Sequence, residues 1–319
     1  MSINRISNGF MTSQSVGFMN QNMLLLSRLQ EKLASGNNIN HPSDDPVGLT
    51  KILDLTNTLS TDERYARNIQ GAQSETQVAD SALSSMTELL HRAKDLAIQG
   101  ANVTTSQTGR NALAQEIDGI INQLVQLGNT SIGGKYIFGG KRTDAPPFDR
   151  PPGSDDINYS GNLPTDNWRR TIEISKGVTV DVNLNGQSIL GNVQTLAPAP
   201  LPPTFSPGSG GVFKTLVELK LDLLGGNTTE IRQRLDEMDV NLDQVLAQQA
   251  TVGASANRLD LTAKRIEERQ GILTQQYADI QNIDAAKLIS DLNAMENTFQ
   301  TSLGVTARVL QPSLLNYLR

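Results

Sequence analysis

Residues 231–280 read IRQRLDEMDVNLDQVLAQQATVGASANRLDLTAKRIEERQGILTQQYADI, and apolar side chains recur in them at alternating steps of four and three. Only Gln249 and Gln270 interrupt the apolar repeat, which runs without proline through Ile231, Leu235, Met238, Leu242, Val245, Gln249, Val252, Ala256, Leu259, Ala263, Ile266, Gln270, Leu273, Tyr277 and Ile280. A spacing of 3.5 residues held over about seven heptads is typical of a helix packed along other helices. At about 1.5 Å per residue this helix would be roughly 75 Å long, so its apolar seam needs long partner helices.

The chain offers such partners before and after a different middle region. Apolar residues at helical spacing predict helices within residues 13–33, 45–101 and 113–127, a short helix at 213–224, and a last helix beyond residue 280. The later half of the second helix has a seam with many small residues, namely Ile69, Ala72, Thr76, Ala79, Leu83, Met86, Leu90, Ala93 and Ala97. Small seam residues allow a partner backbone to approach closely.

Turn and cap residues mark the place where the first two helices meet. Gly36, followed by two asparagines, predicts a left-handed end to the first helix. Ser43 or Asp44 is expected to cap the second helix, with Pro46 in its first turn, where a missing N–H costs nothing. The adjacent Asp44 and Asp45 are therefore interpreted as helix-start residues and not as an acid–base pair.

Glycine and proline become frequent from Gly128 onward, and a strand pattern lies among them. Residues 170–175 alternate between apolar and polar, Lys176-Gly177 predicts a turn, and residues 178–184 alternate again. Asn185-Gly186 is expected to form a further turn. This region therefore predicts a small β-rich domain.

The sequence predicts a mainly α fold with an inserted β-rich domain, in which both chain ends build one long heptad-patterned helical rod. The expected parts are terminal coiled-coil segments at 1–44 and 281–319, long rod helices at 45–140 and 212–280, and the insert at 141–211, whose β-rich part (141–195) is followed by a Pro/Gly linker (197–211). The apolar faces of the two terminal helices carry Phe18, Leu25, Leu29, Leu33, Leu288, Leu292, Met295, Phe299 and Leu303. These faces are wider than one partner helix would cover. We expect the terminal segments to be poorly ordered in the monomer and to order on assembly; a helical bundle without an assembly role is the competing interpretation.

Composition excludes several classes of function. The 319 residues carry a net charge of −6 and no dense Lys/Arg run, which argues against a nucleic-acid partner. No stretch approaches 18 consecutive apolar residues, so no membrane span is expected, and the first residues lack the pattern of a cleaved secretory signal. The absence of cysteine removes disulfides, thiol catalysis and Cys-ligated metals.

Catalytic, cofactor-binding and metal-ligating residues are not expected. His41 and His91 are the only histidines and lack the spacing of a zinc site. The glycines near 128–135 do not match a phosphate loop, because the required glycine is Asn129 and the required Ser or Thr is Tyr136. The rival interpretation is an enzyme or ligand-binding module on the β-rich domain, which lacks clustered histidines, paired carboxylates or a nucleophile.

The segment LASGNNINHPSDDPVGL, residues 33–49, resembles the N-terminal signature of the bacterial flagellin superfamily. Further stretches that resemble the superfamily lie at 88–102, 131–140, 159–161 with 171–186, 252–259 and 313–318. Within it, PSDDPV at 42–47 and YIFGG at 136–140 are more similar to the hook-associated branch at the hook–filament junction than to filament flagellins. Pro312 and the linker depart from the pattern.

The resemblance implies a structural role, not an enzyme, at the hook–filament junction of the extracellular flagellum. Such proteins are exported unfolded by the flagellar type III apparatus, with an export chaperone and without a cleaved signal. Their terminal helices form an inner coiled-coil tube, so the nine apolar residues named above are expected to form the assembly interface. The implied partners are further copies of the chain in a ring, the first hook-associated protein and flagellin. The alternative within the same superfamily is flagellin itself, the filament subunit.

Overall fold

The computed structural model describes residues 8–163, 168–193 and 210–310. Backbone contacts divide the chain into two compact units, which we describe separately. We call Asp62–Glu267 the central unit, and Met1–Thr61 together with Glu268–Arg319 the terminal unit. The elements are α1 (Asn8–Ser35), α2 (Pro46–Gly100), α3 (Gln107–Gly128), β1 (Ser131–Ile132), β2 (Lys135–Tyr136), β3 (Phe148–Asp149), β4 (Asn158–Tyr159), β5 (Thr171–Ser175), β6 (Val178–Asp181), α4 (Gly186–Leu190), α5 (Gly211–Gly225), α6 (Thr228–Gln281) and α7 (Ala285–Leu310). Long helices from both chain ends with a strand-containing insert confirm the predicted fold class.

Helix α6 confirms the seam predicted from the heptad repeat. None of its seam positions is exposed, and one residue in every seven is buried through the central unit. These buried residues are Ile231, Met238, Val245, Val252, Leu259 and Ile266. The predicted seam of α2 is buried as well, at all positions from Ile69 to Ala97. The seams of both helices are therefore closed within the central unit, by the partner helix and by the elements that cover the pair.

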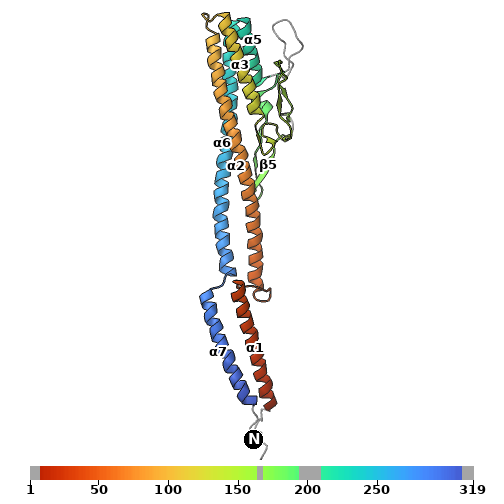
Figure 1. The fold of residues 1–319 in the computed structure, drawn as a ribbon, viewed down its shortest axis with the longest axis vertical. Helices are drawn as coiled ribbons and strands as arrows, with labels where there is room; N and C mark the ends of the chain where they lie inside the picture. The colour runs from red at the N-terminus through yellow and green to blue at the C-terminus, as the bar shows by residue number, and fades with distance from the viewer. Residues whose placement is uncertain (1–7, 164–167, 194–209, 311–319) are drawn as a thin grey trace, which may run out of the picture. The chain divides into compact units, whose positions relative to one another are not determined.

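The core of the central unit lies where α3 and α5 cover the α2–α6 pair (Figure 1). Phe213 of α5 is fully buried, and its ring meets the edge of Phe148, from β3, at 5.4 Å between centroids. Phe148 also packs on Tyr159 of β4, at 5.1 Å. Through these rings the insert shares one apolar core with the helices.

The described residues between α3 and α5 contain three short antiparallel strand pairs: β1–β2, which precedes the insert, and β3–β4 and β5–β6 within it. The pair β5–β6 is the hairpin predicted from alternation, and its turn is Lys176-Gly177, with Gly177 at a φ of 71°. The second predicted turn, Asn185-Gly186, is wrong. Asn185 instead caps the short helix α4, where its Oδ1 accepts the Ser188 N–H at 3.1 Å. Asparagine oxygens serve turns and helix starts alike, so the sequence did not separate the two.

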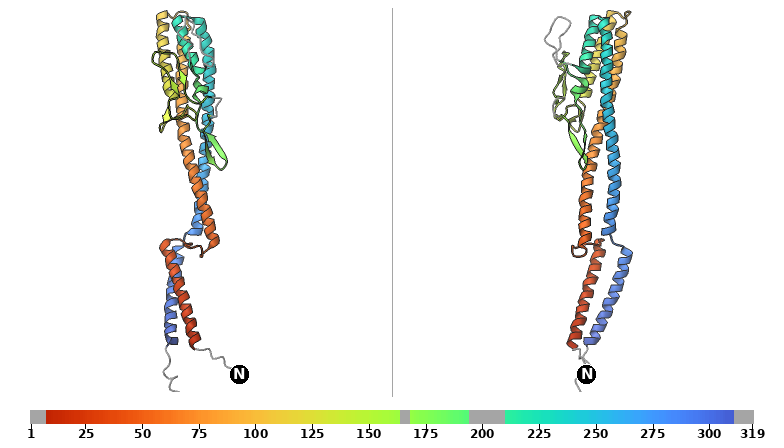
Figure 2. Two further views of the ribbon diagram at one scale, coloured as in Figure 1. Left: turned by 90° about the vertical axis from the view of Figure 1, so that its right-hand side faces the viewer. Right: turned by 180° about the vertical axis from the view of Figure 1, so that it is seen from behind.

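In the terminal unit, α1 and α7 run side by side in opposite directions (Figure 2). The Asn22 side chain of α1 donates a hydrogen bond to Ser302 Oγ of α7 at 3.2 Å. None of the helices in the described ranges is long and apolar enough to cross a membrane. The resembling stretch at 313–318, Pro312 and linker residues 197–209 lie outside the described residues.

The junction between the first two helices partly follows the prediction. Helix α1 ends at Ser35 before Gly36, whose φ of 74° confirms the left-handed stop. The predicted caps are wrong, because Asp45 Oδ1 accepts the N–H groups of Val47 and Gly48 at the start of α2. With Pro46 as the first helical residue, the residue directly before it takes the cap position.

In the terminal unit, the loop that follows α1 is hydrogen-bonded to the connection that follows α6. Asn37 forms an isolated antiparallel bridge with Asn282, and the Asn38 N–H donates to the Gln281 carbonyl at 2.6 Å. The buried Gln281 side chain in turn donates to the Ile39 carbonyl at 3.2 Å. These hydrogen bonds tie the loop between α1 and α2 to the connection between α6 and α7.

Candidate assembly interface

The α1–α7 pair has almost no core of its own. Among the side chains described on these two helices, Thr306 alone is buried. None of the nine predicted interface residues is buried. Phe18 (56%), Leu25 (48%), Leu33 (37%) and Leu303 (43%) are exposed, and the half-buried members are Leu29, Leu288, Leu292, Met295 and Phe299. The pair therefore leaves much of its apolar surface in contact with water.

A groove between α1 and α7 brings three of these residues together. It has a volume of about 490 Å³, and Leu25 and Leu29 face Met295 across it. Its full lining is Leu25, Arg28, Leu29, Lys32, Ser43, Asp44, Asp291, Ala294, Met295 and Thr298. Each helix contributes positions i, i+3, i+4 and i+7, which is the face that a third packed helix would contact.

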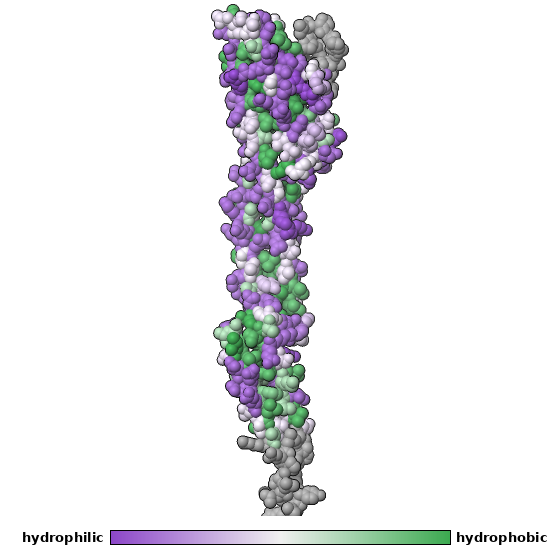
Figure 3. All heavy atoms as spheres, viewed as in Figure 1, coloured by the Kyte–Doolittle hydropathy of each residue, from purple (hydrophilic) through white to green (hydrophobic). Residues whose placement is uncertain are grey.

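Phe18 lies in a second groove, of about 410 Å³, with Val305 and Thr306 of α7. The remaining predicted residues, Leu33, Leu288, Leu292, Phe299 and Leu303, line neither groove. The predicted interface is therefore spread over the pair, with two hollows in it. Figure 3 shows hydrophobic residues on the visible face of both helices.

The prediction missed apolar residues that are exposed to a similar degree. Phe10 (63%), Leu24 (63%), Ile289 (46%) and Val305 (55%) also reach the surface of α1 and α7. For Leu24 the available signal was the run MLLL at 23–26, because four successive apolar residues place side chains all around a helix. A heptad template selects one stripe and leaves the others out.

Charged residues border the first groove. Arg28 and Lys32 of α1 line it together with Asp44 and Asp291. The pKa of Asp44 lies below its usual value, mainly because the backbone N–H of His41 donates to its carboxylate. His41 itself is exposed and pairs with Glu31 at 2.8 Å. The groove is thus lined by apolar side chains and by charged side chains of both signs, an arrangement suited to an amphipathic helix.

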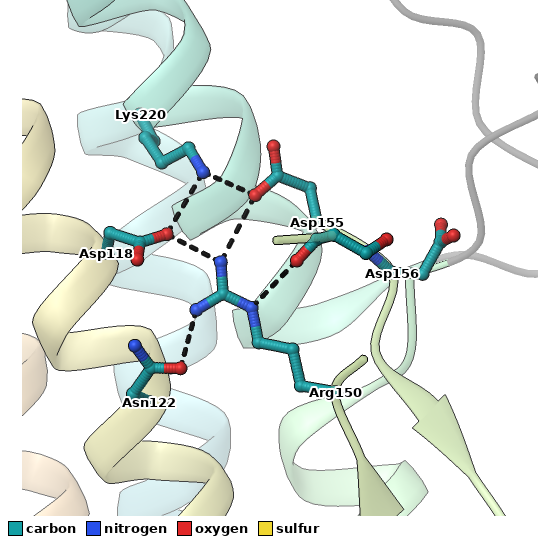
Figure 4. A network of polar contacts seen from close by, with 7 residues as sticks. Asp118, Asn122, Arg150, Asp155, Asp156 and Lys220 are labelled. Carbon is teal, nitrogen blue, oxygen red and sulfur yellow. Dashed lines mark hydrogen bonds and ion pairs between the residues drawn. The ribbon is translucent and has the colours of Figure 1, made fainter. Parts of the chain in front are cut away.

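A second polar cluster joins the insert to the helices of the central unit (Figure 4). Arg150, which follows β3, reaches Asp118 of α3 at 2.5 Å and Asp155 of the insert at 3.2 Å. Lys220 of α5 contacts the same two carboxylates. Burial alone would raise the pKa of Asp118, but hydrogen bonds from Arg150 and Lys220 hold it below its usual value.

Arg150 and Lys220 each contact both carboxylates, so the two positive charges balance the two negative charges. A carboxylate held ionised in this way is a poor proton carrier, and the arrangement fastens the insert instead of forming an acid–base pair. No group of three His, Asp or Glu side chains in the described ranges could hold a metal ion. Sequence reasoning missed the cluster, because its members are far apart in the chain.

Comparison with models of protein families identifies the family of this chain. The family model "bacterial flagellin N-terminal helical region" matches residues 6–143, and the model "bacterial flagellin C-terminal helical region" matches residues 235–318. The chain belongs to the bacterial flagellin superfamily. The two matched regions cover more than two thirds of it and leave out most of the insert.

Two similar proteins are both named flagellar hook-associated protein 3. The flagellar hook-associated protein 3 of Salmonella typhimurium LT2 is 31% identical over 150 residues, which is 47% of this chain and 47% of the relative. The protein of that name from Escherichia coli K12 is 24% identical over 309 residues, which is 93% of this chain and 94% of the relative. Flagellins match too: that of Bacillus subtilis 168 is 24% identical over 321 residues, 96% of each chain.

A solved structure shows the same fold. The flagellar hook-associated protein-3 of Legionella pneumophila superposes with a TM-score of 0.60 at 18% identity. The match covers 72% of this chain and 98% of that one. Most of this fold thus recurs in a protein named as hook-associated.

Proposed function

We propose that this protein is a structural subunit of the hook–filament junction of the bacterial flagellum. The observation that carries the proposal is the apolar face of the α1–α7 pair, which has one buried side chain among those described. Neighbouring subunits cover this face on assembly. The role requires no catalysis, and it agrees with the polar cluster of the insert, whose charges are matched.

The energetics favour cover by other helices. Fully burying a large apolar side chain contributes about 1.5–3 kcal/mol, and the pair exposes or half-exposes all nine residues of the predicted interface. Two helices with little mutual core are marginal alone, because helical stability in proteins comes mainly from packing of an apolar face. Assembly supplies the missing packing, and the terminal segments order fully at that step.

The choice of the junction over the filament rests on two supports. The stretches PSDDPV and YIFGG resemble the hook-associated branch, and hook-associated relatives match the chain in sequence and in fold. Flagellin, the filament subunit, is the alternative, since a flagellin matches the chain at the same identity as the Escherichia coli relative.

The partners follow from the role. Copies of the chain form a ring through α1 and α7, with the first hook-associated protein on one side and flagellin on the other. The subunit reaches this extracellular site through the flagellar type III export apparatus, with an export chaperone and without a cleaved signal. A helix of a neighbouring subunit binds in the groove between α1 and α7, which carries charges of both signs.

Localisation tests the proposal directly. Gold-labelled antibody on isolated flagella is expected at the boundary between hook and filament only. Label along the filament would make the chain a flagellin, and no label on the organelle would refute both roles.

A pair of substitutions tests the interface itself. Leu25→Asp with Met295→Asp places two charges in the groove and is expected to abolish incorporation, although the monomer remains helical by circular dichroism. The matched control is Val103→Asp, which changes an apolar residue that is 76% exposed in the turn between α2 and α3. Normal incorporation of the double variant would refute the assignment of the groove.

A further inference from the structure

The β5–β6 hairpin builds a small apolar core apart from the main one. Its buried members are Ile174, Val180 and Val182 of the insert, Tyr65, Ile69 and Ala72 of α2, and Leu259 and Ile266 of α6. We call this group the hairpin cluster. Figure 2 shows the hairpin against both helices, beyond the part of the central unit where α3 and α5 lie. Here the two helices have one covering element instead of several.

Both helices contribute large apolar side chains at this level, Tyr65 and Ile69 from α2 and Leu259 and Ile266 from α6, together with smaller ones. Ala66 and Ala72 lie on α2 and Ala263 on α6, all within the hairpin cluster or packed against it. Ile174 of the hairpin is 0% exposed and Val180 is 4% exposed. The hairpin therefore adds a third element to the apolar volume that holds α2 and α6 together over this length.

The hairpin is shaped for this contact. Its pairing register shifts between Glu173 and Ser175, which leaves Ile174 without an opposite residue in β6. Such bulges re-aim a side chain, and the Ile174 side chain is fully buried in the hairpin cluster. The bulge thus directs the largest hairpin contact toward the helices.

Polar contacts anchor the hairpin to α2. Asn68 Nδ2 donates to the Glu173 carbonyl at 2.9 Å, and Tyr65 OH donates to Glu173 Oε1 at 3.3 Å. Arg170, just before β5, forms an ion pair with Glu75. The members of the cluster from α6, Leu259 and Ile266, are both apolar, so contact with this helix depends on packing.

We propose that the β5–β6 hairpin is a strap that clamps α6 against α2 and opens as a local unit while the main core stays folded. Proteins open in cooperative parts, and a part with few buried contacts opens before one with many. When the long α2–α6 pair is deformed, the strap opens locally, and the main core stays intact.

Native-state hydrogen exchange on the full chain tests the strap. Ile174→Ala is expected to speed exchange in residues 62–76, 171–181 and 252–267 by about 30-fold or more, because it removes a fully buried branched side chain. Peptides from α3 and α5 should keep their rates. Val180→Ala, a milder change in the same cluster, should speed the same peptides less, which keeps the test valid if Ile174→Ala folds poorly.

Two controls give the result its meaning. Ile121→Ala makes the same change in the main core on α3, and it should speed exchange in α3 and α5. Thr179→Ala, at an exposed position of the hairpin, should change nothing. Uniform acceleration of the whole central unit by Ile174→Ala would overturn the proposal. Acceleration confined to the hairpin, with α2 and α6 unchanged, would overturn it as well, since the helices would then not depend on the strap.

Discussion

The central and terminal units both contain helices with an apolar stripe, but the stripe is covered to different extents in the two units. In the central unit, the seam of α2 and α6 is closed by the partner helix, α3, α5 and the insert. In the terminal unit, α1 and α7 have only each other and leave Phe18 and Leu25 largely exposed. An apolar stripe therefore predicts that a helix is packed against something, but it does not identify the partner. In the central unit the partner is the same chain, and in the terminal unit, as we propose, it is other subunits.

The largest expected difference concerns local stability in the monomer. Amides of α1 and α7 should exchange at least about 1,000-fold faster than those of α3, since core helices exchange only through global opening, which costs about 5 kcal/mol or more. Hydrogen exchange with mass spectrometry on the purified monomer measures this ratio. Equal protection of all three helices would remove the distinction between the units.

Matched truncations of phenylalanine sharpen the comparison at single residues. Phe213→Ala, in the core of the central unit, should lower the free energy of unfolding by about 3–5 kcal/mol, because it leaves a cavity in a packed interior. Phe18→Ala, at a side chain 56% exposed, should change it by about 0.5 kcal/mol or less in the monomer. Urea titration of both variants provides the values, and similar losses would contradict the assigned difference in burial.

The ion cluster of the insert should matter less than the core. Arg150→Ala leaves Asp118 and Asp155 without one of their two cations and should cost about 1–3 kcal/mol at neutral pH, between the values for exposed and buried pairs. The exposed pair Arg92–Glu116 is the control, and Arg92→Ala should cost less than about 1 kcal/mol.

The same cluster carries a pH dependence of known sign. The pKa of Asp118 is lower in the folded protein than its ordinary value, so the folded state favours the ionised form. Its contribution is complete above the unfolded pKa of about 3.9 and is lost as the pH falls through the folded pKa. The difference between wild type and Arg150→Ala should therefore shrink below about pH 4 in acid titrations of stability. A difference that stayed constant to pH 2 would contradict this origin.

The smallest expected effects concern the helix caps. Ser106→Ala removes the side-chain cap of α3 and should lower the free energy of unfolding by about 1 kcal/mol. Asp45→Ala removes the cap of α2 in the terminal unit, and it should speed exchange in the first turn of α2 with little change in the urea midpoint. A midpoint shift as large as that of Ser106→Ala would show that both units unfold together.

The sequence predicted the features that repeat locally. The seams of α2 and α6, the glycine stop at Gly36 and the β5–β6 hairpin each follow from spacing within one segment. The cap of α2 was misplaced because Ser43 and Asp44 have the same hydrogen-bonding ability as Asp45, whereas Asn185 was assigned to a turn because asparagine serves turns and helix starts alike.

Other features could not be predicted in the same way. The cluster of Asp118, Arg150, Asp155 and Lys220 depends on three segments meeting in space, and no local pattern signals it. The nine candidate interface residues were identified as apolar, but their exposure depends on which partner covers them. That information is not contained in the periodicity of one chain.

The tie between Ile39 and Gln281 sets an order of events for the chain. The two residues are separated by 242 positions, so the connection closes only after nearly all of the chain is present. Contacts of such long sequence separation form late, because a long loop must close first. A chain that ends before α7 keeps its main core but leaves α1 without its partner helix. The α1–α7 pair therefore forms only once α7 itself has been synthesised.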